Sequence, residues 1–288
     1  MLKIVNYQIK KFIENKLITK RTILSNSFKI ICEKITLNDN SNLIIKYYQI
    51  KNNKFNAIKS EGESLLYLNK KFPNLFPNVK YLSNELLIMN FINNDKIKPK
   101  NYNEQLAFNI YQLHKHTNKR YGFYFDSQIG GMKQSNKFTT NWVNFFKEKR
   151  MVMIFETINK KNYMPHSINI KIEKLINNLE NFIPSHPKIS LLHGDLWQGN
   201  ILTNKKKIVS LIDPGIYFGH FEMEIAYLTW FKYIDKGFVK LYSNFIEIKK
   251  EYFEYEFIYQ LYFSLLNVHL WSKEYIKDTN NLLNEMKI

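Results

Sequence analysis

The stretch LLHGDLWQGNIL, Leu191–Leu202, lies between two short apolar runs. It contains a carboxylate, an imidazole, an amide, an indole and two glycines, contributed by His193, Gly194, Asp195, Trp197, Gly199 and Asn200. A tight turn needs only one or two residues of these types. The others belong to the types that carry out chemistry, so this stretch is the candidate site of the chain.

A second acidic residue follows the next apolar run. Asp213 comes directly after residues 207–212, as Asp195 comes shortly after residues 189–192. If these two runs form neighbouring strands, the loops after them open at one edge of a sheet, and Asn200 joins the two carboxylates there. Two carboxylates and an amide give the hard oxygen ligands that Mg²⁺ prefers, usually with water and substrate phosphate. Asp195 is then placed to orient a substrate hydroxyl and accept its proton.

The N-terminal part holds candidates for binding phosphate. Lys46 lies inside the apolar segment LIIKYY, where a lysine needs an acidic partner or a phosphate. Glu61 begins the next expected helix and is a possible partner, and kinases hold nucleotide phosphates with such a lysine–glutamate pair. The alternative is a lysine on a solvated edge strand.

The hydrophobic pattern predicts a small β-rich part followed by a larger helical part. Up to residue 92, it indicates a helix with Val5, Ile9, Phe12 and Ile13 on one face, strands over 28–37, 42–50, 78–82 and 85–92, and a helix over 60–70. Beyond it, the pattern indicates helices around 106–113, 140–158 and 172–179, strands over 189–192 and 207–212, and aromatic-rich helices from Glu222 onward. We therefore predict an α+β chain with an N-terminal lobe, 1–92, and a C-terminal lobe, 93–288.

The composition is that of a soluble globular protein, with 45% hydrophobic and 23% charged residues. The single cysteine, Cys32, excludes an internal disulfide and suits a reducing compartment. No segment reaches the roughly 18 unbroken apolar residues of a membrane helix, and the N-terminus lacks the apolar core of a signal peptide. We expect a cytoplasmic protein that does not bind membranes.

The net charge of +17 raises the possibility of nucleic-acid binding. Only three of the 42 basic residues are arginine, which leads in the recognition of bases and phosphates. The lysines are scattered, and their tightest cluster is Lys205–Lys207 in an expected hairpin turn. Enrichment in Lys, Asn and Ile points to A/T-rich codons as the source of the charge, so we do not expect a nucleic-acid partner.

The motifs together resemble one family. HGDLWQGN, followed by IDPGIYFGHFEMEIAYL, is similar to the fructosamine kinase family, whose relatives are the aminoglycoside and choline phosphotransferases of the protein-kinase-like fold. The segment RYGFYFDSQIGGMKQSNKFTTNWVNFFKEKR resembles the family's glycine-aromatic-aspartate turn, its Gln-x-Asn and its Trp-x-x-Phe-Phe helix ending in arginine. The resemblance spans nearly the whole chain in order and implies a bilobal fold that uses ATP and Mg²⁺.

The resemblance also implies roles for individual residues. Asp195 matches the catalytic base, Asn200 and Asp213 the magnesium ligands, and Lys46 and Glu61 the phosphate-binding pair. The backbone near Asn90 and Ile92 matches the hinge that meets adenine. Trp197 would form a wall of the sugar pocket, with a packed core aromatic as the alternative. His193 is expected to support the turn through the loop backbone rather than to act as a base.

Three positions depart from the family pattern. The turn over the phosphates, expected in LSNSFK, has Ser25, Asn26 and Ser27 but no glycine, although close approach to phosphate is easiest for glycine. Cys32 falls in the following strand, so the redox role of a cysteine in that turn is not assigned to it. Glu224 replaces the usual aspartate at the start of a helix behind the site, where it is expected to give structural support.

We therefore predict an ATP- and Mg²⁺-dependent kinase for a sugar hydroxyl of fructosamine or ribulosamine adducts on amines or protein lysines. The first alternative is an aminoglycoside- or choline-type phosphotransferase, and the second is a nucleotide-binding protein without turnover. The histidine pairs His114/His116 and His220/His269 lack the companion cysteine or carboxylate pattern of a zinc site.

Overall fold

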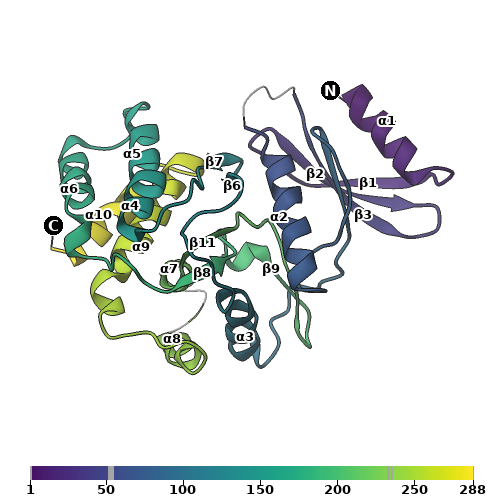
Figure 1. The fold of residues 1–288 in the computed structure, drawn as a ribbon. Coiled ribbons are helices and arrows are strands. Elements are labelled where there is room, and N and C mark those ends of the chain that lie inside the picture. The colour runs from purple at the N-terminus through teal and green to yellow at the C-terminus, as the bar shows by residue number, and fades with distance from the viewer. Residues whose placement is uncertain (1, 51–54, 232–233, 235, 288) are drawn as a thin grey trace. The chain divides into compact units, whose positions relative to one another are not determined.

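The computed structural model describes residues 2–50, 55–231, 234 and 236–287. The chain forms two compact units, whose elements are labelled in Figure 1. The first comprises Met1–Tyr102, Asp126–Lys133 and Gly199–Gly215, and the second comprises Asn103–Phe125, Gln134–Gln198 and Ile216–Ile288. Each unit therefore collects segments that are far apart in the sequence. The lobe boundary after residue 92 stays a prediction.

The first unit is built on a five-stranded antiparallel sheet (Figure 1). Its strands, in the order in which they pair, are β1 (Ile18–Ser27), β2 (Ile30–Leu37), β3 (Asn42–Tyr48), β5 (Leu86–Asn90) and β4 (Val79–Leu82). The pattern predicted the last four of these strands and missed β1. Nearly all of β1 is exposed, so its sequence ITKRTILSNS lacks the alternation of apolar and polar residues that marks a half-buried strand.

Two helices pack with this sheet. The predicted N-terminal helix is α1 (Leu2–Ile13), which buries Val5, Ile9 and Ile13 in one core cluster with residues of the sheet strands. Helix α2 (Ala57–Lys71) begins after Asn56, whose side chain caps the helix by accepting a hydrogen bond from the backbone nitrogen of Lys59. Glu61 lies in the second turn of α2.

Two short hairpins complete the first unit. Strands β6 (Ser127–Ile129) and β7 (Met132–Gln134) pair around Gly130 and Gly131, and β9 (Ile201–Thr203) pairs with β10 (Ile208–Leu211). The expected pairing of 189–192 with 207–212 is wrong, because β8 (Ile189–Leu192) pairs with β11 (Tyr217–His220) instead. Strand β10 pairs with β9, which directly precedes it, whereas β8 pairs with a strand that lies beyond this hairpin in the sequence.

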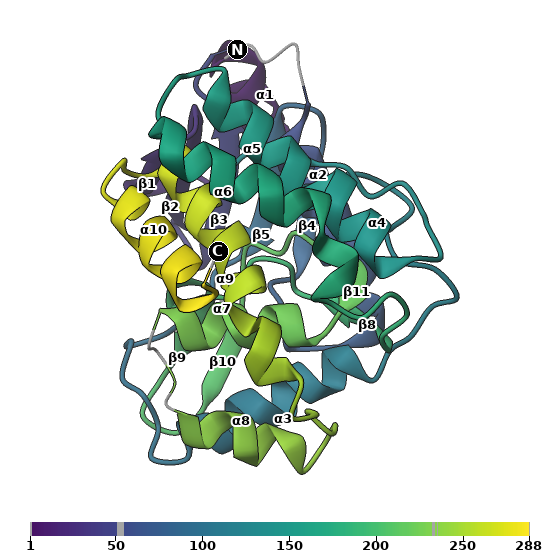
Figure 2. The same ribbon diagram turned by 90° about the vertical axis from the view of Figure 1, so that its left-hand side faces the viewer.

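The second unit is mainly helical. Its longest helix, α9 (Tyr252–Leu270), contacts α5 (Val152–Asn159), α7 (Glu222–Trp230) and α10 (Tyr275–Glu285). These helices are labelled in Figure 2. The remaining helices are α3 (Tyr102–His114), α4 (Trp142–Phe146), which continues as a π-helical turn over Lys147–Met151, α6 (His166–Asn177) and α8 (Lys236–Ser243). None of the helices in the described ranges is long and apolar enough to span a membrane.

Candidate active site

Lys46 forms two ion pairs within the first unit. Its Nζ donates to Glu61 Oε1 at 2.8 Å and to Asp213 Oδ1 at 2.6 Å. Lys46 is 7% exposed and Glu61 5% exposed, whereas the side chain of Asp213 is 39% exposed. The sequence placed these residues 15 and 167 positions apart, and the fold joins them into one cluster, which we call the Lys46 cluster.

Two opposing effects act on the pKa of Lys46. Burial would lower this pKa, because it disfavours the charged form, but the carboxylates of Asp213 and Glu61 more than offset burial and raise it above its ordinary value. Burial raises the pKa of Glu61 to about 7, against the opposing effect of Lys46. The lysine is therefore a fixed cation at physiological pH.

Asn200 and Asp213 lie close together in the first unit. The backbone nitrogen of Ile212 donates a hydrogen bond to the carbonyl of Asn200 at 2.9 Å. Asp213 is the next residue after Ile212, so its backbone lies near that of Asn200. Asp213 has φ of 57°, a left-handed conformation that is uncommon for residues other than glycine and worth notice at a functional site. The two side chains offer a carboxylate and an amide oxygen, which is the ligand chemistry that Mg²⁺ takes.

The described residues contain no group of three or more His, Cys, Asp or Glu side chains arranged to hold a metal ion. Mg²⁺ does not need such a cage. It usually binds through one or two protein oxygens and completes its shell with water and substrate phosphates. The Asn200–Asp213 pair therefore fits Mg²⁺ delivered with a nucleotide and fits a tightly held zinc ion poorly.

The turn that carries Asp195 belongs to the second unit, where it follows strand β8. Gly194 has φ of 84°, which favours glycine at this position. Asp195 and Trp197 are partly exposed, while Leu196 between them is fully buried. The alternation anchors the turn through Leu196 and leaves the carboxylate and the indole accessible. Trp197 is thus not a packed core residue.

The side chain of Glu224 is hydrogen-bonded to the backbone of this turn. Its Oε1 accepts from Gly194 N at 2.8 Å, and its Oε2 accepts from His193 N at 3.3 Å. The backbone nitrogen of Asp195 in turn donates to Nδ1 of His193 at 3.3 Å. The side chains of Glu224 and His193 thus both contact the backbone of this turn, and their supporting role stays a prediction.

Sequence reasoning missed two residues behind Glu224. Nε2 of His114, in α3, lies 3.0 Å from Glu224 Oε2, and its Nδ1 lies 2.7 Å from the hydroxyl of Tyr242 in α8. Burial would raise the pKa of Glu224, but hydrogen bonding to His114, with smaller effects from His193 and Gly194, lowers it overall. Glu224 is thus a carboxylate that accepts from Nε2 of His114, and the hydroxyl of Tyr242 is hydrogen-bonded to the other nitrogen of that ring. The spacing of His114 in the sequence gave no signal of this role.

The segment LSNSFK, in which the phosphate turn was expected, contains the end of a strand and a hairpin turn. Ser25, Asn26 and Ser27 are the last residues of strand β1 and pair with Cys32, Ile31 and Ile30 of β2. The turn itself is Phe28–Lys29, where both residues have positive φ, 55° and 66°, as a two-residue type I′ hairpin requires. The hairpin turn thus lies inside the segment LSNSFK, and the contact of Ser25, Asn26 and Ser27 with phosphate stays a prediction.

The expected hinge lies at the end of strand β5. Asn90 pairs with Leu43 of β3, and its side-chain oxygen accepts from the backbone nitrogen of Asn78 at 2.5 Å. Ile92 follows the strand, and its carbonyl accepts from the side chain of Asn94 at 3.1 Å. Their contact with adenine stays a prediction.

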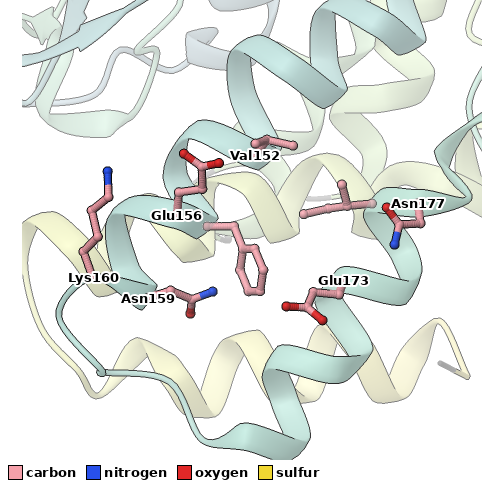
Figure 3. A pocket seen from close by; sticks show the side chains of 8 residues that line it. Val152, Glu156, Asn159, Lys160, Glu173 and Asn177 are labelled. Carbon is pink, nitrogen blue, oxygen red and sulfur yellow. The ribbon is translucent and has the colours of Figure 1, made fainter.

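A pocket of about 580 Å³ opens between α5 and α6 of the second unit (Figure 3). Its lining includes the apolar side chains of Val152, Phe155 and Ile176 and the carboxylates of Glu156 and Glu173. None of the predicted site residues lines this pocket, so we do not assign it to the candidate active site.

Comparison with known proteins identifies the origin of this arrangement. Residues 10–288 match the sequence profile of the family described as fructosamine kinase. The chain belongs to the fructosamine kinase family. Membership accounts for the order of the motifs, and it makes the chain an ATP-dependent phosphotransferase that acts on an alcohol.

Individual fructosamine kinase relatives agree with this assignment. A protein of Pasteurella multocida named "Probable ketoamine kinase" is 29% identical over 79% of this chain and 80% of its own length. "Protein-ribulosamine 3-kinase, chloroplastic" of Oryza sativa subsp. japonica is 30% identical over 62% of this chain and 53% of its own length.

The fold matches solved structures of this group. A crystal structure from Thermobifida fusca that is named after fructosamine-3-kinase superimposes with a TM-score of 0.85 at 20% identity, covering 98% of both chains. At 20% identity this match is evidence for the fold alone. The predicted protein-kinase-like fold, with a β-rich N-terminal part and a helical C-terminal part, is confirmed.

Proposed function

We propose that the chain transfers the γ-phosphate of ATP to a sugar hydroxyl of ketosamines, namely fructosamine or ribulosamine adducts on amines or protein lysines. The observation that carries the proposal is the Lys46 cluster, a buried lysine held by Glu61 and Asp213. The names of the relatives support the substrate class. The phosphorylated adduct falls apart, so the reaction serves to repair glycation.

Each residue of the proposal has a role that its environment permits. Asp195, partly exposed, accepts the proton of a hydroxyl held within about 3 Å of it. Lys46 binds the nucleotide phosphates, and Glu61 keeps its ammonium in place. The turn formed by Phe28 and Lys29, with Ser25–Ser27 before it, covers the phosphates, and the backbone at Asn90 and Ile92 meets adenine.

Asn200 and Asp213 would hold Mg²⁺ through an amide oxygen and a carboxylate oxygen. The ion, when bound, neutralises charge that develops on the transferred phosphoryl group. The hydrogen bond from the backbone nitrogen of Ile212 to the carbonyl of Asn200 brings together the backbone segments that carry these two side chains.

Two observations favour a ketosamine over an aminoglycoside acceptor. Trp197 offers a partly exposed indole, whose flat apolar face suits the C–H face of a sugar. A polycationic aminoglycoside needs accessible carboxylates, yet Glu222 and Glu224 are 3% and 2% exposed and are bonded to protein groups. We therefore expect Trp197→Ala to raise KM for the sugar substrate more than KM for ATP.

We place the enzyme in the cytoplasm, with a small-molecule or protein-linked ketosamine as its partner rather than nucleic acid. The single cysteine supports a reducing compartment. The rice relative, by contrast, is named as chloroplastic. Cell fractionation of the native host with an antibody against the chain would decide the location.

The test of function is a competition assay with purified protein, ATP and Mg²⁺, in which mass spectrometry reads out the phosphorylated product. The mixture contains ribulosyl-lysine, fructosyl-lysine, kanamycin and choline. We expect transfer to the ketosamines, lost in Asp195→Asn by a factor of about 10² to 10⁴, the usual contribution of a general base. Transfer to kanamycin or choline alone would overturn the substrate assignment, and no transfer from ATP to any acceptor would overturn the kinase assignment.

A further inference from the structure

Arg150 is a fully buried cation whose hydrogen bonds go to neutral groups. It lies in the π-helical turn after α4, where Nη1 donates to the carbonyls of Ser135 and Lys149, both at 2.9 Å. Nη2 donates to Asn136 Oδ1 at 2.8 Å, and the guanidinium lies over the ring of Tyr217 at 4.1 Å. Within the described ranges, no carboxylate lies within ion-pair distance of it. Burying a cation without a counter-charge costs free energy, whereas burying an apolar residue at the same place would not. The hydrogen bonds that Arg150 makes are therefore expected to have a role.

The partner of Arg150 is itself a branching point. Asn136 is 1% exposed, and its Nδ2 donates to the carbonyls of Phe125 and Ile216, at 3.1 and 3.3 Å. One amide therefore joins its own segment to those of Phe125 and Ile216, 11 and 80 residues away, while Arg150 binds the amide's oxygen. We call Asn136 and Arg150 with these bonds the Asn136–Arg150 clamp.

Both carbonyls bound by the clamp lie where the chain passes from one unit to the other. Phe125 is the last residue before the segment Asp126–Lys133, and Ile216 is the first residue after the segment Gly199–Gly215. The clamp thus holds the ends of the two segments that leave the second unit.

Each of these segments leads to a carboxylate of the Lys46 cluster. The carbonyl of Asp126 accepts from Ser60 Oγ at 3.0 Å, and Ser60 directly precedes Glu61 in α2. Asp213 stands three residues before Ile216, separated from it by Pro214 and Gly215. The restricted backbone of the proline leaves this link little freedom.

We propose that Asn136 and Arg150 are positioning residues for the phosphate- and metal-binding groups, acting through the covalent chain on Asp213 and through Asp126 on the start of α2. The inference rests on the proposed function for the roles of Lys46 and Asp213. The amide of Asn136 accepts one hydrogen bond and donates two, which uses both kinds of group that it carries. Asn136→Asp keeps the acceptor and removes both donors. The substitution therefore tests the hydrogen bonds to Phe125 and Ile216, while it gives Arg150 a counter-charge.

The first measurement is hydrogen exchange of the protein without nucleotide or metal. We expect Asn136→Asp to speed amide exchange about tenfold in peptides covering 124–127 and 213–218, because these segments lose their anchor, with little change in α9. Thr279→Val is the matched control, since it removes another buried hydrogen bond of the second unit, between Thr279 and Ser264. It should leave exchange at 124–127 and 213–218 as in the parent.

The second measurement is steady-state kinetics with a ketosamine substrate. A displacement of 1 Å at a catalytic group costs about 100-fold in rate, so we expect Asn136→Asp to lower kcat between about 10- and 100-fold. The half-saturating Mg²⁺ concentration should rise about tenfold while KM for the ketosamine changes less than about twofold, because only the metal-binding side is displaced. Thr279→Val should change neither constant.

Several results would overturn the proposal: unchanged exchange at both segments, exchange that rises equally throughout the second unit, or equal effects on Mg²⁺ and ketosamine saturation. If Asn136→Asp does not fold, Arg150→Lys is measured in the same way, since it keeps the charge and loses the forked donor. If the parent protein transfers no phosphate, the proposed function fails, and hydrogen exchange alone still decides whether the clamp holds the two segments.

Discussion

The carboxylate of Glu224 accepts a hydrogen bond from the backbone nitrogen of Gly194 at 2.8 Å. Gly194 directly precedes Asp195 in the sequence. The position of the proposed catalytic base is therefore set by a buried carboxylate 29 residues further along the chain. That carboxylate is hydrogen-bonded to His114, and His114 is hydrogen-bonded to Tyr242. The backbone contact, rather than any contact with substrate, is what Glu224 contributes.

Replacing Glu224 by glutamine should displace the turn. A glutamine presents one NH₂ group, so one of the backbone N–H groups of His193 and Gly194 faces a donor instead of an acceptor. We expect kcat to fall about 100-fold with Kd for ATP within about twofold, as for a misplaced catalytic group. Glu222→Gln, two residues earlier on α7, changes an equally buried glutamate that bonds Tyr255 and serves as the control. Equal kcat values for the two variants would contradict this role for Glu224.

The Lys46–Glu61 pair allows stability to be separated from nucleotide binding. Lys46→Met leaves Glu61 buried without its cation, and breaking a buried ion pair costs about 3–5 kcal/mol. Adding Glu61→Gln should restore most of that free energy of unfolding, because no buried charge is left unpaired. Neither the single nor the double variant should bind ATP–Mg²⁺ as the parent does. Urea unfolding and calorimetry measure the two properties, and parent-like ATP affinity in the stable double variant would show that the phosphates bind elsewhere.

Asp213→Asn tests the metal site. The substitution keeps the shape of the side chain and removes the charge that would bind Mg²⁺, so we expect turnover to fall by a factor of about 10² to 10³. Circular dichroism should show an intact fold, because the side chain is 39% exposed. Asp95→Asn is a suitable control, since Asp95 caps a surface loop through Ile97 and Lys205. Magnesium-dependent turnover close to that of the parent in folded Asp213→Asn would remove Asp213 from the metal site.

A buried histidine and glutamate should give opposite dependences of stability on pH. Burial, with a smaller effect of His114, lowers the pKa of His220 to about 3, from 6.5. Burial raises the pKa of Glu222 to about 7, from 4.5, against the opposing hydrogen bond from Tyr255. Between pH 4.5 and 6.5 the folded chain keeps a proton on Glu222 that the unfolded chain releases, and it lacks one on His220 that the unfolded chain binds. In the parent these two contributions cancel.

Single substitutions should expose each contribution. In His220→Gln only Glu222 titrates, so the free energy of unfolding should fall relative to the parent as pH rises from about 4.5 to 7, because deprotonation favours the unfolded chain. In Glu222→Gln only His220 titrates, so stability should fall as pH drops from about 6.5, with a slope of up to about 1.4 kcal/mol per pH unit. Urea unfolding at pH 5 and 6 suffices, and slopes of the same sign in both variants would refute the opposed titration.

The sequence was sufficient for the elements whose pattern is local. Strands β2 and β3 and helix α1 were predictable because apolar residues recur at the period of each structure. The exposed strand β1 was not, since an edge strand with polar residues on both faces has no such pattern.

The same division holds for the site. The motif HGDLWQGN and the residues Lys46, Glu61 and Asp213 could be read from residue type and order, because chemistry restricts which side chains can serve. The partners of those residues could not be read in this way. His114 supports Glu224, and Asn136 joins Phe125 to Ile216, across separations of 110, 11 and 80 residues. Such contacts depend on how β8 pairs with β11 and how the helices pack around them, and only the tertiary structure decides which buried polar groups meet, because each must find a hydrogen-bond partner wherever the fold provides one.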